Sequence, residues 1–144
     1  MRTSLFLTLA LVGPGCAPRQ EQVAVGELCV IGNTAFGATT FPAGAPLQVT
    51  LGAGHTVCRD PCDTVVSPPC TVVRDGNTFR VQGRIEVEVD CHGKTPPPAC
   101  SFPGVGCATE PVGPGVYTVT DGVRTVTVTV PETRPNGDFR VCSP

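Results

Sequence analysis

The stretch GVYTVTDGVRTVTVTV (115–130) alternates valine or tyrosine with threonine on both sides of an Asp-Gly pair. Successive side chains of a β-strand point to opposite faces, so this period of two predicts strands with one buried and one wet face. A two-residue loop at Asp121-Gly122 would pair Thr120 with Val123 and Tyr117 with Val126. We therefore predict a hairpin whose buried face carries Tyr117, Val119, Val126, Val128 and Val130. Its hydrophilic face carries Thr118, Thr120, Thr125, Thr127 and Thr129.

Similar patterns occur elsewhere in the chain. In CTVVRDGNTFRV (70–81) the pair Asp75-Gly76 separates two apolar runs, which predicts a second hairpin with Val72 opposite Phe79. The alternation continues through residue 89, and Gly83 marks a bend where the strand passes between sheets. Weaker strands are expected at 26–32, 46–52 and 138–142. About seven strands at this spacing predict an all-β fold of the β-sandwich class.

The composition and motifs of the sequence argue against nucleic-acid binding and against catalysis. The 144 residues carry 10 basic and 12 acidic side chains, with no Trp and one Tyr, so neither a basic stripe nor a stacking surface for nucleic acid is present in the sequence. Glu86 and Glu88 share a strand face and could in principle act as an acid–base pair. A solvated face, however, does not shift the pKa values of two carboxylates apart, as an acid–base pair requires. No nucleophile motif is found. We expect a protein that is not an enzyme and has no cofactor.

The N-terminus has the layout of an export signal. A short apolar run over residues 5–12 follows Arg2 and is too short to span a bilayer. GPGC (13–16) resembles the lipobox of bacterial lipoproteins, with Gly15 as the small residue before the cysteine. This resemblance implies a signal peptide over 1–15, acyl chains such as palmitate on Cys16, and a membrane partner held through that anchor. The absence of Asp at position 17 implies the outer membrane, and a plain secreted protein is the alternative.

The cysteine count supports the same interpretation. Nine cysteines less Cys16 leave an even set, and an exported chain meets oxidising conditions. We expect a tether over 16–25 and a disulfide-rich domain over 26–144. Its four disulfides would join Cys29, Cys58, Cys62, Cys70, Cys91, Cys100, Cys107 and Cys142. Each three-membered cluster, 58–70 and 91–107, must send at least one link outside itself. Cys29 and Cys142 are partners either for each other or for these clusters.

Two further resemblances concern the fold. VGPGVYTV (112–119) resembles the tyrosine corner of immunoglobulin-like and fibronectin type III domains. This resemblance implies a disulfide-rich immunoglobulin-like β-sandwich after an N-terminal signal helix, in which the Tyr117 hydroxyl bonds backbone a few residues upstream. The strand around 70–81, the cysteine-rich loop and the YTV strand together resemble small cysteine-rich lipoproteins of myxobacteria. That family implies no activity.

The expected function is a non-enzymatic envelope module that is structural or recognises a protein or glycan, and two alternatives stay open. The loop CHGKTPPPAC (91–100) resembles the reactive loop of Bowman–Birk serine protease inhibitors, with Lys94 filling a trypsin-like pocket and Thr95 after the resisted bond. A metal-binding protein could use His55, His92 and neighbouring thiols. The paired C-x-x-C spacing of structural zinc sites is absent, which favours disulfides over a metal site.

Overall fold

The computed structural model describes residues 19–35, 38–54, 57–59, 64–89, 99–101, 103–135 and 140–143. The expected signal peptide and Cys16 lie outside these ranges. Every regular element within them is a β-strand, which confirms the all-β class, and the strands are shorter and more numerous than the seven expected. They are β1 (Arg19–Val23), β2 (Glu27–Ile31), β3 (Asn33–Ala35), β4 (Ala38–Phe41), β5 (Pro46–Gly52), β6 (Val57–Arg59), β7 (Thr64–Val65), β8 (Thr71–Asp75), β9 (Thr78–Gln82), β10 (Ile85–Val89), β11 (Ala99–Ser101), β12 (Gly104–Pro111), β13 (Gly115–Thr120), β14 (Thr125–Val130), β15 (Glu132–Pro135) and β16 (Arg140–Cys142). The described parts of the chain contain no apolar helix of membrane-spanning length.

Two four-stranded sheets form the sandwich. One has the strand order β12-β5-β2-β16 and the other the order β14-β13-β9-β8, with β13 and β9 running parallel. Their inner faces share one apolar core because each strand places alternate residues inward. The largest fully buried side chains of the two sheets include Leu28, Val30, Val49 and Leu51 from the first and Phe79, Val81, Val119 and Val128 from the second.

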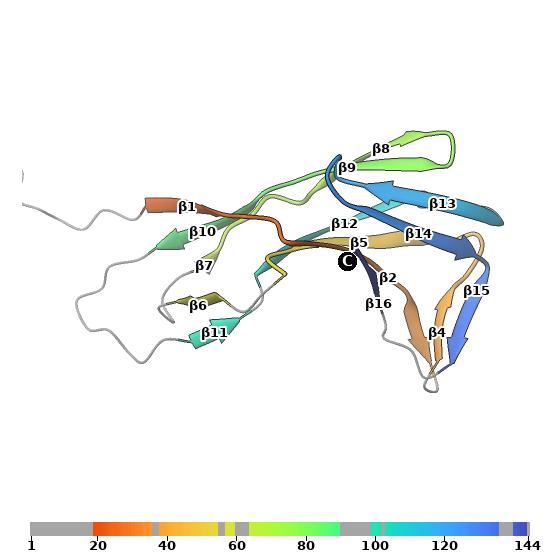
Figure 1. The fold of residues 1–144 in the computed structure, drawn as a ribbon, viewed down its shortest axis with the longest axis horizontal. Helices are drawn as coiled ribbons and strands as arrows, with labels where there is room; N and C mark the ends of the chain where they lie inside the picture. Colours follow the sequence, from red (N-terminus) through yellow and green to blue (C-terminus); the bar gives the residue numbers. More distant parts are fainter. Residues whose placement is uncertain are drawn as a thin grey trace, which may run out of the picture.

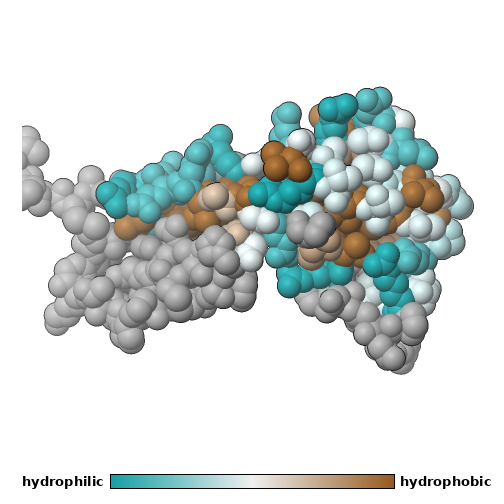
Figure 2. All heavy atoms as spheres, viewed as in Figure 1, coloured by the Kyte–Doolittle hydropathy of each residue, from teal (hydrophilic) through white to brown (hydrophobic). Residues whose placement is uncertain are grey.

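Smaller sheets extend both ends of the sandwich. Strands β15, β4 and β3 form one of them, and β1, β10 and β7 form another at the opposite end of the long axis (Figure 1). The space-filling view shows hydrophobic residues as an interrupted band flanked by hydrophilic ones (Figure 2). Residues 19–23, expected within a tether, are strand β1, which pairs with β10 along its whole length. The described domain therefore begins upstream of residue 26.

The bend expected at Gly83 is confirmed. The strand pattern stops at Gly83 and Arg84, and the chain passes from β9 in the second sandwich sheet to β10 beside β1. A Cβ atom at position 83 would lie 2.7 Å from the Cβ of Cys70 and 2.9 Å from a methyl carbon of Leu51. Only glycine lets the crossing strand approach these two side chains so closely.

The hairpin over 115–130 is correct in its faces and wrong in its register. Its expected inward residues are buried, but Thr120 pairs with Thr125 rather than with Val123. The loop has four residues because the Asp121 carboxylate accepts the backbone N–H groups of Val123 and Arg124, at 2.9 and 2.6 Å. Partial burial raises the pKa of Asp121, but these hydrogen bonds and the Arg124 guanidinium outweigh it and lower that pKa overall. A shift of two positions preserves which residues face inward.

The second hairpin shows the same kind of error. Asp75 pairs with Thr78, so the two-residue loop is Gly76-Asn77 and not Asp75-Gly76. Val72 consequently lies opposite Val81 rather than Phe79. Gly76 has a φ of +61°, the positive φ that both turn types favoured in two-residue hairpin loops, I′ and II′, need at the first loop position.

The tyrosine corner implied by the resemblance is formed. The Tyr117 hydroxyl donates to the Gly113 carbonyl oxygen, four residues upstream, at 2.9 Å, and the ring is 4% exposed. This bond fixes the turn that leads into β13 while the ring packs in the core.

Replacing Tyr117 by phenylalanine is expected to lower the free energy of unfolding by about 1 kcal/mol, because the ring stays packed and only the hydrogen bond is lost. Urea unfolding of the wild type and Tyr117→Phe checks this value. Thr129→Val, on the exposed face of the paired strand, is the control and should change stability by less than about 0.5 kcal/mol. An unchanged midpoint for Tyr117→Phe would show that the bond contributes nothing.

Candidate functional site

The candidate site lies on the outer face of the first sandwich sheet. Alternation in β2 turns Leu28 and Val30 into the core and Glu27 and Cys29 outward. Cys142 of β16 is the register partner of Cys29, and their sulfurs are joined in a disulfide that spans 113 residues of sequence. The disulfide therefore fastens the C-terminal strand to the sheet.

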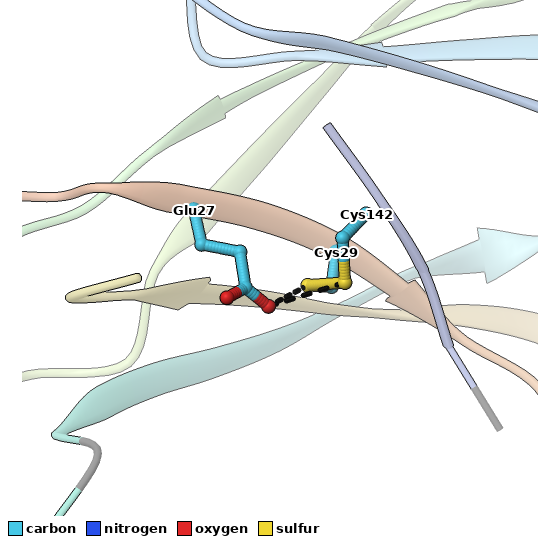
Figure 3. A group of neighbouring side chains, drawn as sticks. All are labelled: Glu27, Cys29 and Cys142. Carbon is cyan, nitrogen blue, oxygen red and sulfur yellow. Dashed lines mark hydrogen bonds between the residues drawn. A yellow bond between two sulfur atoms is a disulfide. The ribbon is translucent and has the colours of Figure 1, made fainter. Parts of the chain in front are cut away.

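Glu27 lies against both sulfurs of this disulfide. One carboxylate oxygen, Oε1, is 2.5 Å from the Cys29 Sγ atom and 3.1 Å from the Cys142 Sγ atom (Figure 3). The same oxygen accepts a hydrogen bond from the Arg140 guanidinium at 3.0 Å. A disulfide sulfur carries no hydrogen, so the carboxylate meets the sulfurs without a donated proton, and its hydrogen bond comes from the Arg140 side.

A shallow hollow of about 160 Å³ opens beside the disulfide. Its floor is low because Gly52 of β5 and Gly104 of β12 are register partners of each other and Gly52 is also the partner of Glu27. The remaining wall residues are Cys29, Ile31, Thr50, Ala53, Gly54, Pro103 and Arg140. This volume is below the several hundred cubic ångströms typical of drug-sized ligand pockets.

The group formed by Glu27, Cys29 and Cys142 brings three side chains of metal-ligating type within 4.8 Å of one another. Two of the three are the sulfurs of the disulfide, and only a thiolate is a zinc ligand. In its oxidised state the group is a covalent link beside an ion pair rather than a metal site.

A second disulfide joins the two sandwich sheets. Cys70, 6% exposed and just before β8, is bonded to Cys107 of β12 across the core. The bond links the 58–70 cluster to the 91–107 cluster, as the cluster arithmetic requires. Nearby, Arg74 forms an ion pair with Glu110 of β12 at 2.7 Å and covers the rings of Phe79 and Tyr117 at 5.5 and 5.9 Å. The hydrogen bond to Glu110 raises the pKa of Arg74.

Two more of the expected disulfide cysteines lie in short strands. Cys58 and Cys100 are register partners across β6 and β11. Outside the described residues lie Cys16, Cys62, Cys91, Lys94 and Thr95, together with His55 and His92 of the metal alternative.

Sequence reasoning missed the two charged residues of the site. Glu27 and Arg140 are 113 positions apart, and each is an ordinary charged residue on the outer face of a strand. Their positions two residues from Cys29 and Cys142 were the available signal, because residues i and i+2 of a strand share a face.

Comparisons with known protein families, characterised proteins and solved structures found no match.

Proposed function

We propose that the chain is an exported, lipid-anchored envelope protein whose disulfide-rich sandwich is a non-enzymatic structural or recognition module. The observation that carries this proposal is the pair of disulfides, one closing almost the whole domain and one joining its two sheets. The Cys70–Cys107 bond lies in the core and the Cys29–Cys142 bond on the outer face of its sheet. Such bonds persist in oxidising compartments outside the cytosol.

The chemistry of the described surface supports a role without catalysis. The sulfurs near Glu27 are bonded to each other and therefore offer no nucleophile, while its carboxylate is engaged by Arg140. Carboxylates such as Glu110 and Glu132 form ion pairs on exposed or half-exposed sheet surfaces. A recognition role would then use the surface of the sandwich, with a protein or glycan as the ligand class.

The position of β1 predicts which end of the sandwich would lie near the membrane. Arg19 begins β1 and is only three positions after Cys16, and three residues of extended chain span at most about 11 Å. An acyl chain on Cys16 would hold the sheet β1-β10-β7 next to the membrane surface. The opposite end of the sandwich, with β3, β4 and β15, would then point away from the bilayer (Figure 1).

Replacing Cys16 by serine is expected to abolish incorporation of a labelled fatty acid, because the acceptor sulfur is lost. Cells expressing the wild type or Cys16→Ser would be fed labelled palmitate, and the purified protein would be counted. The neighbouring change Ala17→Ser keeps the cysteine and should retain the label. Equal labelling of wild type and Cys16→Ser, or no labelling of the wild type, would contradict the anchor.

A further inference from the structure

We propose that the Glu27 carboxylate, positioned by Arg140, protects the Cys29–Cys142 disulfide from anionic thiols and leaves Cys142 as the sulfur open to attack. This inference concerns how the C-terminal strand stays fastened, and it does not depend on the lipid anchor. Exported disulfides meet small thiols in their surroundings, so resistance to exchange affects how long the domain remains cross-linked.

Accessibility decides which sulfur reacts. Exchange begins when a thiolate attacks one sulfur of the disulfide and forms a mixed disulfide with it. Cys29 is 2% exposed, whereas Cys142 in the short edge strand β16 is half-buried. The incoming thiolate therefore reaches the Cys142 Sγ atom.

The electron balance of this step places negative charge beside Glu27. The thiolate sulfur bonds to Cys142 Sγ, the bond between Cys142 and Cys29 breaks, and Cys29 Sγ leaves with the electron pair. A second thiolate then attacks the reductant sulfur of the mixed disulfide and releases Cys142 as a thiolate. The protein disulfide is thereby reduced, and the two reductant molecules are oxidised to a disulfide with each other. The Glu27 Oε1 atom is 2.5 Å from the leaving sulfur and 3.1 Å from the attacked one. A carboxylate at this position opposes both the approach of an anion and the charge that builds on Cys29.

Arg140 affects the incoming thiolate in two ways. Its guanidinium donates to the same Oε1 atom at 3.0 Å and so holds the carboxylate at the sulfurs. Its positive charge also offsets part of the repulsion felt by an incoming anion. Glu27 and Arg140 are the charged residues that line the hollow in the described part of the chain.

The test compares reductants of opposite charge on the intact, oxidised protein. Samples are treated with an anionic thiol, 2-mercaptoethanesulfonate, or a cationic thiol, cysteamine. Free cysteines are then alkylated, and each disulfide is followed by peptide mass spectrometry. Rates for each variant are divided by the wild-type rate with the same thiol, which removes the intrinsic reactivity of the reductant.

We expect Glu27→Gln to speed reduction of Cys29–Cys142 by the anionic thiol about fivefold, the factor of one screened unit charge at contact distance. With the cationic thiol, the same substitution should speed reduction by a smaller factor or slow it. The first mixed disulfide should form at Cys142. The reduction rate of Cys70–Cys107 should not change in this variant. Glu132→Gln breaks a different ion pair, with Arg134, and should leave the reduction rates of both disulfides unchanged.

Two results would overturn the proposal. Equal acceleration of both thiols by Glu27→Gln would mean that the Glu27–Arg140 ion pair acts by holding β16 in place rather than by charge. A first mixed disulfide on Cys29 would show that burial does not select the attacked sulfur.

Discussion

Replacing Cys29 and Cys142 together by alanine is expected to lower the free energy of unfolding by about 5 kcal/mol. The disulfide closes 113 residues of sequence, so its loss releases nearly the whole unfolded domain from a covalent constraint. Other contacts of β16 include three register pairs with β2 and two hydrogen bonds between Leu28 and Ser143. Arg140 forms its ion pair with Glu27, and Val141 packs against the core.

The second disulfide supplies the matched control. Cys70 and Cys107 are 37 residues apart, so their replacement by alanine should cost about 1 kcal/mol less than that of the longer pair. Chemical denaturation of both double variants measures the difference. Equal losses, or a larger loss for Cys70→Ala/Cys107→Ala, would show that core packing around Cys70 matters more than loop length.

Replacing Phe79 by alanine is expected to lower the free energy of unfolding by about 3–5 kcal/mol. Phe79 of β9 is 1% exposed, and its ring lies 5.7 Å from the ring of Tyr117. Removing it leaves a cavity between the sheets and withdraws one of the two rings beneath the Arg74 guanidinium.

Val73→Ala is the control for this substitution. Val73 belongs to the adjacent strand β8, but its side chain is 59% exposed on the outer face. Its truncation should change the free energy of unfolding by less than about 0.5 kcal/mol in the same assay. Similar losses at both positions would contradict the assignment of inner and outer faces.

The hairpins show what alternation in a sequence can determine. A period of two identifies the buried face, and the inward positions of β13 and β14 are buried as expected. The register depends on how the loop closes, which the Asp-Gly pairs did not reveal. At residues 121–124 the Asp121 carboxylate satisfies two backbone N–H groups and makes a four-residue loop, a choice invisible to the strand pattern.

Strand β12 shows why other elements were missed. GVGCATEP (104–111) has two glycines, an alanine and a proline, all poor strand formers, and it reads as part of the cysteine-rich loop. Its inward positions include Val105 and Thr109, and the Thr109 hydroxyl accepts the Leu47 N–H at 2.9 Å. Pairing with β5 and the bond to Cys70 stabilise this strand, so tertiary contacts override its weak propensity.

The candidate site was predictable only in its cysteines. Parity and an oxidising compartment predict disulfides, and the structure joins Cys29 to Cys142, one of the two outcomes left open. The hollow depends on Gly52 and Gly104 becoming register partners of Glu27 and of each other. Such a cross-strand arrangement is set by the registers of three strands, and the sequence did not specify them.

The proposed function requires that this sandwich be exported, processed at Cys16 and fully oxidised. Intact-mass spectrometry of the protein purified from membranes tests it most directly. The expected mass is that of residues 16–144 plus the acyl groups on the N-terminal Cys16, lowered by two hydrogens for each disulfide among the remaining eight cysteines. A chain that keeps residues 1–15, lacks the lipid, or carries free thiols at Cys29, Cys142, Cys70 or Cys107 would contradict it.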